Sequence, residues 1–216
     1  RTVFVRIYKP GEEDGEVWRT DGTPEGTGLA FDLHWPGNLF GFQGSLYFTA
    51  ASGRDFLTPR GLWRLRPSGG RPELLGIVSQ PLGWPVSAPG PDFVPMGGRL
   101  FFTGQEREGG GELWVTDGTS AGTRRVRDLR PGPASSEPAG LAAAEGRIYF
   151  TARDGEHGRE LWVSDGTAEG TRLAVDLNPG GFSSSPTSLT MANGYLFFTA
   201  DDGMTGSEPW AMPLDP

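Results

Sequence analysis

The sequence predicts an all-β protein assembled from repeated four-stranded antiparallel sheets, and three observations support this prediction. An octamer recurs nearly unchanged, the segments around it alternate apolar and polar residues as strands do, and Gly, Pro, Asn and Asp interrupt those segments about every 8 to 12 residues. No segment has the periodicity of a helix. The octamers are EVWRTDGT at 16–23, ELWVTDGT at 112–119 and ELWVSDGT at 160–167.

The octamers set the length of the repeat. Each contains one tryptophan, and weaker copies at 61–63 and 208–210 contain two more. The five tryptophans are separated by 45, 51, 48 and 48 residues, so the period is about 48. Four antiparallel strands in a period of this length are typical of a β-propeller blade. The motif tryptophans are Trp18, Trp63, Trp114, Trp162 and Trp210.

The fourth repeat shows the expected order of strands. A strand of small residues at 140–144 precedes a tight turn and the apolar strand RIYFTA at 147–152. The octamer supplies the third strand, at 160–164, and the fourth strand is expected at 172–177. Two-residue hairpin turns need positive φ, and suitable pairs occupy the first turn in three repeats. These pairs are Gly97-Gly98, Glu145-Gly146 and Asn193-Gly194.

We label the strands of a blade A to D from the axis outward. The chain is then expected to begin at strand B of one blade (2–7), to continue through three complete blades, and to end after strand C of a fifth, near Ala211. Eighteen strands are expected, in sheets of three, four, four, four and three. We expect one propeller domain over 1–216, closed into a ring with the two incomplete blades side by side; a fragment of a larger array is the alternative. The repeats are about 1–37, 38–85, 86–132, 133–180 and 181–216.

Composition narrows the function classes. The 216 residues carry a net charge of −8, and Lys9 is the only lysine, which argues against the basic stripe that nucleic-acid binding needs. No cysteine is present, so thiol catalysis, zinc ribbons and iron-sulfur clusters are excluded. No run approaches the roughly 18 apolar residues of a membrane span. We therefore expect no nucleic-acid partner and no membrane span.

Recurring motifs resemble those of the ELWxxDGT repeat family of bacterial, mostly exported proteins. They are the octamers, the Gly-Thr pair that follows each, the Pro-Gly and Ser-Ser-x-Pro connection, and the strand LFFTA. The resemblance spans nearly the whole chain. It implies a propeller-like protein that is extracellular or in the cell envelope, with a poorly defined molecular role. The second repeat departs from the pattern, because RPSGGR at 66–71 replaces the Asp-Gly-Thr turn.

Two repeated features have a structural and a functional interpretation. The motif tryptophans are expected to pack between neighbouring blades, and a ligand-stacking platform is the alternative. The Asp side chains of the turns at Asp21, Asp117 and Asp165 are expected to accept hydrogen bonds from the backbone N–H two residues on. A Ca²⁺ site there is the alternative, although each turn offers one carboxylate and calcium takes about six or more oxygens. No other cofactor is expected.

Loops that join strands B to C and D to A share one end of a propeller, and this end carries the candidate ligand-binding residues. For its carboxylates, a solvated charged rim and an acidic, cation-dependent docking surface are both open. For the loop tryptophans, ligand contact and plugging of the blades are both open. The candidate residues are Trp35, Trp84, Phe182, Asp154, His157, Asp201 and Asp202.

The sequence favours a binding module over an enzyme. His34 and His157 are the only histidines, so a Ser-His-Asp site or a multi-histidine metal site has few residues to draw on. We assign no catalytic residue. The alternative is a polysaccharide hydrolase or lyase that uses Asp154, Glu156 or Asp201 together with His157.

We predict an exported, non-enzymatic module that recognises a protein or glycan at a cell surface through the loops at one end of the propeller. A further alternative is a structural assembly unit. In that case the unpaired outer strand 208–211 would accept a strand from another chain, so that the protein self-associates.

Overall fold

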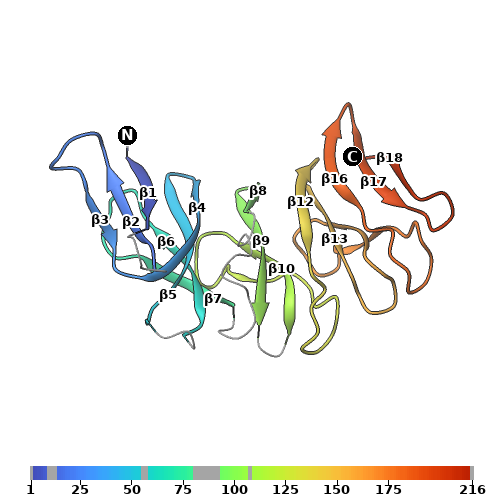
Figure 1. Cartoon of the computed structure of the whole chain (residues 1–216), viewed down its shortest axis with the longest axis horizontal. Helices are drawn as coiled ribbons and strands as arrows, with labels where there is room; N and C mark the ends of the chain where they lie inside the picture. The colour runs from blue at the N-terminus through green and yellow to red at the C-terminus, as the bar shows by residue number, and fades with distance from the viewer. Residues whose placement is uncertain (1, 9–13, 55–57, 80–92, 107–108, 215–216) are drawn as a thin grey trace. The chain divides into compact units, whose positions relative to one another are not determined.

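The computed structural model describes residues 2–8, 14–54, 58–79, 93–106 and 109–214, and over these ranges the protein is all-β, without a helix (Figure 1). No helix that could cross a membrane is therefore found in these ranges. Eighteen strands form five antiparallel sheets of three, four, four, four and three strands in chain order. Each sheet is a β-propeller blade, so the predicted fold class and strand count are confirmed. Closure of the blades into one ring stays a prediction.

The chain comprises two compact units, Arg1–Pro91 and Asp92–Pro216, called here the first and the second unit. The first unit holds two sheets, β1 (Val3–Ile7), β2 (Glu16–Thr20) and β3 (Gly28–Phe31), followed by β4 (His34–Phe42), β5 (Ser45–Ala51), β6 (Arg60–Leu65) and β7 (Glu73–Ser79).

The second unit holds three sheets, and in each of them consecutive strands are hydrogen-bonded neighbours. The sheets are β8 (Val94–Met96), β9 (Arg99–Glu106), β10 (Gly110–Thr116) and β11 (Arg124–Arg125); β12 (Ala139–Ala144), β13 (Arg147–Ala152), β14 (Glu160–Ser164) and β15 (Arg172–Val175); and β16 (Thr187–Ala192), β17 (Tyr195–Asp201) and β18 (Ser207–Pro213).

Sequence and structure agree closely in the fourth repeat. Its first three expected strands are β12, β13 and β14, each within one residue of the predicted bounds. The fourth strand is shorter than expected, because β15 ends at Val175. The N–H of Leu177 donates to the carboxylate of Glu160 (3.2 Å) in place of a strand partner.

The first turn of the repeats has the predicted backbone conformation. Asn193 and Gly194, between β16 and β17, have φ of 52° and 77°. Glu145 and Gly146 have φ of 47° and 71° at the same place in the preceding sheet. Two successive positive φ values are the requirement of a type I′ hairpin turn, which is why these positions hold Asn or Gly so often.

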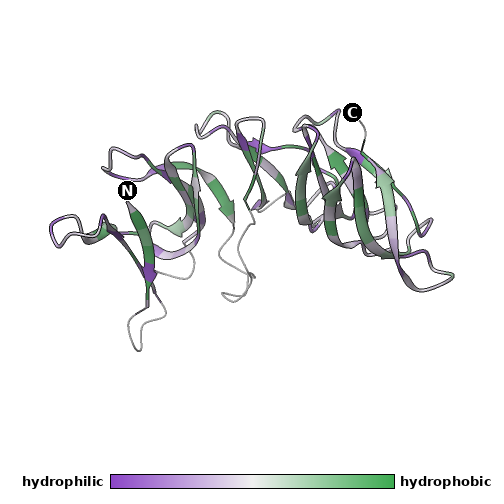
Figure 2. Cartoon of the chain, turned by 90° about the horizontal axis from the view of Figure 1, so that it is seen from above, coloured by the Kyte–Doolittle hydropathy of each residue, from purple (hydrophilic) through white to green (hydrophobic). Residues whose placement is uncertain are grey.

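The apolar cores lie between consecutive sheets. In the second unit one cluster joins the β8–β11 sheet to the β12–β15 sheet, and another joins the latter to the β16–β18 sheet. A corresponding cluster joins the two sheets of the first unit. Trp63, Trp162 and Trp210 pack in or against these clusters, so these three tryptophans lie between neighbouring blades as predicted. Figure 2 shows hydrophobic residues concentrated along the strands.

The Asp-Gly-Thr turns are stabilised by their Asp side chains, as predicted. Asp117 Oδ1 accepts hydrogen bonds from the N–H (2.8 Å) and the hydroxyl (2.7 Å) of Thr119. The Thr119 hydroxyl in turn accepts the N–H of Gly122 (2.9 Å). Asp21 and Asp165 accept the same pair of hydrogen bonds from their own turns. Every turn is therefore held by bonds within its own few residues.

Candidate ligand-binding surface

The candidate surface lies at one end of the second unit, where three segments meet. They are the loop between β13 and β14 (153–159), the loop between β17 and β18 (202–206), and the connection between β15 and β16 (176–186). A Cβ atom on Gly158 would lie 1.8 Å from the carbonyl oxygen of Phe182, and one on Gly203 would lie 2.7 Å from Asn178 Oδ1. The connection therefore touches both loops, and we call the three segments together the loop surface.

The two loops of this surface have the same hydrogen-bonding pattern, in which one Asp side chain accepts two backbone N–H groups. Asp154 Oδ1 accepts hydrogen bonds from the N–H groups of Glu156 (3.0 Å) and His157 (2.8 Å). Asp202 Oδ1 accepts them in the same way from Met204 and Thr205, both at 2.9 Å. Hydrogen bonds from the turn, first of all from Thr205, lower the pKa of Asp202. Both carboxylates thus shape their own loops.

His157 is held against Asp154. Its Nδ1 lies 2.8 Å from Asp154 Oδ2, and its Nε2 lies 4.0 Å from Asp176 Oδ2. The hydrogen bond to Asp154 raises the pKa of His157. Burial, the largest single influence on Asp154, raises its pKa, but the hydrogen bonds from His157 and Glu156 together lower it. The pair is consequently an imidazolium with a carboxylate in weakly acidic solution.

Two large apolar side chains of the loop surface are exposed to solvent. Phe182 is 72% exposed and Met204 is 89% exposed, the highest values among the large hydrophobic residues that the structure describes. Phe182 sits in the connection and Met204 at the tip of the last loop. Asp201 is the last residue of β17, and its Oδ1 accepts the N–H of Gly203 (2.7 Å). The surface therefore combines exposed apolar groups with carboxylates that are already hydrogen-bonded.

A buried glutamate fixes the connection that carries Phe182. Glu160, the first residue of the octamer, is fully buried. Its carboxylate accepts hydrogen bonds from the N–H of Ser184 (2.6 Å), from the Ser184 hydroxyl, and from the N–H of Leu177 (3.2 Å). Burial raises its pKa. Because both ends of the connection bond to one carboxylate, its conformation is set by the octamer.

The preceding repeat contains the same arrangement. Glu112 is fully buried and accepts hydrogen bonds from the N–H (3.1 Å) and hydroxyl (2.5 Å) of Ser136 and from the N–H of Leu129 (3.2 Å). Burial raises the pKa of Glu112 to about 7, and the nearby Asp128 adds to this effect. We call each such group a glutamate latch. Sequence reasoning missed the latches, although the sequence shows a Glu two residues before Trp114 and before Trp162, each followed by a Ser 24 residues after that Glu.

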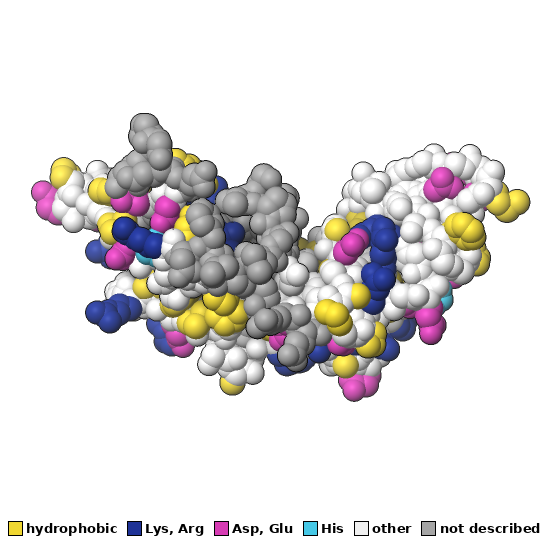
Figure 3. All heavy atoms as spheres, turned by 60° about the horizontal axis from the view of Figure 1, so that its bottom comes forward, with side chains coloured by type: hydrophobic (Ala, Val, Ile, Leu, Met, Phe, Trp, Pro, Cys, Tyr) yellow, Lys and Arg dark blue, Asp and Glu magenta, His cyan; other side chains and the backbone are white. Residues whose placement is uncertain are grey.

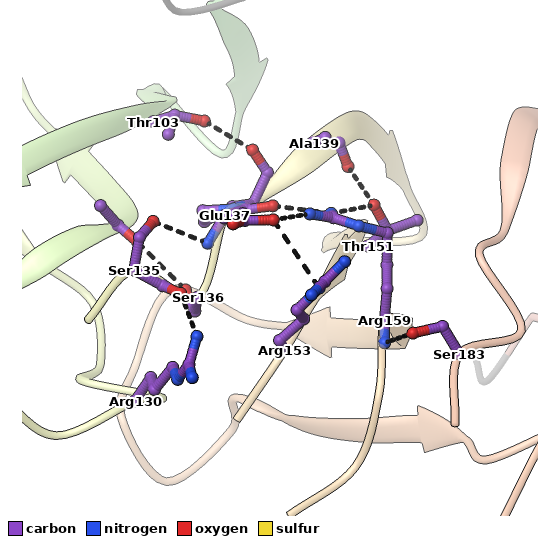
Figure 4. A network of polar contacts seen from close by, with 12 residues as sticks. Thr103, Arg130, Ser135, Ser136, Glu137, Ala139, Thr151, Arg153, Arg159 and Ser183 are labelled. Atoms are coloured by element: carbon purple, nitrogen blue, oxygen red, sulfur yellow. Dashed lines mark hydrogen bonds and ion pairs between the residues drawn. The ribbon is translucent and has the colours of Figure 1, made fainter. Parts of the chain in front are cut away.

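The connection between β11 and β12 is further held by an ion-pair network (Figure 4). The Glu137 carboxylate accepts a hydrogen bond from Arg159 and lies 3.7 Å from Nε of Arg153. Arg159 also donates to the Glu137 carbonyl (2.8 Å), and its own N–H donates to the hydroxyl of Ser183 (2.8 Å). Arg159 thus joins the two Ser-Ser-x-Pro connections, which strengthens the frame beneath the loop surface.

Trp35 lies in the first unit, in a strained backbone conformation. Its φ is 47°, its N–H donates to Asp14 Oδ1 (2.6 Å), and its carbonyl accepts a hydrogen bond from Arg60. His34 Nδ1 lies 2.6 Å from Asp14 Oδ2. The side chain of Trp35 is half-buried. Trp84, the other predicted loop tryptophan, lies outside the described residues.

The structure therefore brings Asp154, His157, Phe182, Asp201 and Asp202 to one end of the second unit. In the ranges that the structure describes, no group of three or more His, Asp or Glu side chains is placed to hold a metal ion.

Figure 3 shows positively and negatively charged side chains on the visible face. Met204 was missed because the equivalent position in the preceding repeat is the polar Glu156.

No family model matches the chain, and no curated protein sequence does so either. Among solved structures, the chain is similar to a putative TolB from Agrobacterium tumefaciens, with a TM-score of 0.47 and 13% identity over 98% of this chain and 77% of that one. It is also similar to an α-L-arabinofuranosidase from Clostridium thermocellum ATCC 27405, with a TM-score of 0.32 and 11% identity over 92% of this chain and 81% of that one.

A third similar structure is an acylaminoacyl peptidase from Pyrococcus horikoshii, with a TM-score of 0.46 and 15% identity. The match covers 98% of this chain but only 34% of the peptidase, so the chain spans about a third of that protein. At these identities the similarities concern the fold alone.

Proposed function

We propose that this chain is a non-enzymatic binding module that recognises a protein or glycan surface through the loop surface of the second unit. The observation that carries the proposal is the exposure of Phe182 and Met204 on segments whose own polar groups are hydrogen-bonded. Because hydrogen bonds already hold the backbone of these segments, binding does not have to order it, and the exposed side chains can supply apolar contact area. The polar groups around them can then orient the ligand.

The carboxylates of the loop surface give less support to an enzyme. A retaining or inverting glycosidase needs one carboxylic acid with a raised pKa as proton donor. The pKa values of Asp154 and Asp202 are both lowered, so both are carboxylates at neutral pH. Glu160 has a raised pKa, but it is fully buried in its latch, where no substrate reaches it.

The resemblance to the ELWxxDGT repeats supports an exported location, and we propose that the ligand is on a cell surface.

Self-association through strand addition is a second candidate function, because β18 is the outer strand of its sheet. Pro209 and Pro213 lie in this strand and have no N–H to donate, which weakens pairing along its free edge. A molar mass that stays at one chain across concentrations, measured by light scattering, would exclude that assembly.

The proposed surface is tested by glycan-array and cell-surface extract binding with the variant Phe182→Ser/Met204→Ser. We expect a loss of at least about tenfold in affinity, because hot-spot side chains contribute on the order of 2 kcal/mol or more. Ile77→Ser is the matched control, since Ile77 is 43% exposed on β7 of the first unit. Equal affinity of the double variant and the control would contradict the proposal.

A further inference from the structure

A cavity of about 440 Å³ lies between the two sheets of the first unit. It opens where the β2–β3, β4–β5 and β6–β7 turns lie, at the end of the first unit opposite to that unit's own B-to-C and D-to-A loops. Phe4, Leu46 and Leu65 contribute apolar side chains to its lining, and the charged residues of the lining are Arg19, Arg66 and Asp21. The volume falls within the roughly 300–1,000 Å³ that is typical of small-molecule sites.

The cavity exists because the first repeat departs from the pattern of the others. Val115 of β10 is buried and pairs with Arg124, which donates to the carbonyl of Gly166 in the next sheet (3.1 Å). In the register of the first sheet, Arg19 stands in the place of Val115 and Gly28 in the place of Arg124. The first sheet therefore lacks the arginine that reaches the next sheet, because Gly28 stands in its place. The charged Arg19 replaces the buried, apolar Val115.

The turn of the second repeat completes the change. In the second unit the ring of Phe101 packs on Gly166, since a Cβ atom there would lie 2.8 Å from the ring. The equivalent residues in the first unit are Phe4 and Pro67, and both line the cavity. The segment that departs from the octamer pattern, RPSGGR at 66–71, therefore borders the cavity.

The charges at the cavity differ in how far they are already engaged. Arg66 lies 3.2 Å from Glu73. The Asp21 carboxylate is hydrogen-bonded by Thr23 of its own turn. Within the described residues, the guanidinium of Arg19 has no hydrogen-bonding or ionic partner, and its Nη1 lies 3.3 Å from the Cβ position of Gly69. Arg19 is therefore the group available to an incoming anion.

We propose that this cavity binds a small ring-bearing carboxylic acid, with the carboxylate on Arg19 and the ring against Phe4 and Leu65. A guanidinium matches a carboxylate with two parallel N–H donors, and an apolar lining covers the face of a sugar or aromatic ring. Uronic acid units of acidic polysaccharides belong to this class, as do simple aromatic acids. The cavity shares no residue with the loop surface, so this proposal does not depend on the proposed function.

The test is a calorimetric and NMR titration of the whole chain with galacturonate, benzoate and galactose. We expect saturable binding of a carboxylate and at least about tenfold weaker binding of the neutral galactose, as the loss of a charge-assisted pair implies. Binding of either carboxylate supports the proposal, and the tighter of the two identifies the source of the ligand. Absence of binding by both, or equal binding of galactose and galacturonate, overturns it.

Two variants separate the site from the fold. Arg19→Val restores the residue found at this position in β10 and β14, so it should fold, and it should weaken carboxylate binding at least about tenfold. Gly28→Arg restores the bridging arginine and should fill the cavity with the same result. Arg71→Val, on an exposed arginine of the neighbouring turn, is the control. Unchanged affinity in Arg19→Val and Gly28→Arg with intact melting curves would refute the assignment.

Discussion

At the scale of single residues, the two glutamate latches give the first residue of two octamers, Glu112 and Glu160, a structural role. A carboxylate buried beside a strand is costly unless it is hydrogen-bonded, and each latch accepts three hydrogen bonds from the following connection. Glu112 and Glu160 bond to the following connection in the same way, so the two connections have the same hydrogen-bonding pattern. The cost of burial is visible in the raised pKa of both groups.

The pKa of Glu112 predicts a pH dependence of stability. Its carboxyl has a pKa of about 7 in the folded chain and an ordinary value of 4.5. Between these values the folded state holds the proton more tightly than the unfolded state. Proton binding by Glu112 therefore adds to the free energy of unfolding, and this addition is fully present below about pH 4.5. It is lost as pH rises through about 7, which lowers the free energy of unfolding by on the order of 3 kcal/mol.

Urea unfolding of the wild type and of Glu112→Gln at several pH values measures this effect. The neutral Gln imitates the protonated acid, so the difference in unfolding free energy between the two proteins should change across this pH window. A difference that is constant from pH 4 to pH 8 would show that Glu112 does not titrate as described.

A second prediction concerns Gly158. Its hydrogen atom faces the carbonyl of Phe182, and a Cβ atom would lie 1.8 Å from that oxygen. Gly158→Ala should lower the free energy of unfolding by about 1–3 kcal/mol, the range of over-packed positions. Gly181→Ala is the control, because a Cβ atom there meets nothing within 4 Å. Equal melting temperatures of the two variants would contradict the described contact.

At the scale of elements, sequence reasoning succeeded where partners are close in the chain. The hairpins of β12 with β13 and β16 with β17 follow from local turn residues and two-residue alternation. It failed to find the latches and the cavity, because both depend on residues brought together by sheet packing. A Glu at the start of a strand resembles an ordinary surface residue until its serine partner, 24 residues away, is placed against it.

The loop between β13 and β14 provides a test at this scale. Asp154→Ala removes the acceptor of two backbone hydrogen bonds and the partner of His157, so the loop should open. Amide exchange at Glu156 and His157 should become faster, and stability should fall by roughly 1–3 kcal/mol. Glu156→Ala, on an exposed side chain of the same loop, is the control. Retained amide protection in Asp154→Ala would refute the role of this carboxylate.

At the scale of the whole molecule, the repeated sheets form a frame, and the residues proposed to bind ligands lie where the repeats differ in sequence. The sheets differ little, while Phe182 and Met204 in the second unit and Arg19 with Pro67 in the first occupy positions where the repeats disagree. The sequence predicted the fold class and the end of the blades that carries the candidate loops. It could not show which carboxylates are free, because that depends on hydrogen bonds within each loop.

Recovery of a bound ligand, followed by determination of its mass, tests whether the loop surface binds without chemical turnover. A ligand found on the glycan array or in the cell-surface extract is incubated with the wild type, eluted and analysed by mass spectrometry. We predict saturable binding and an eluted ligand of unchanged mass. An eluted ligand that is cleaved by the wild type and left intact by Asp154→Asn would show instead that the loop surface is a catalytic site.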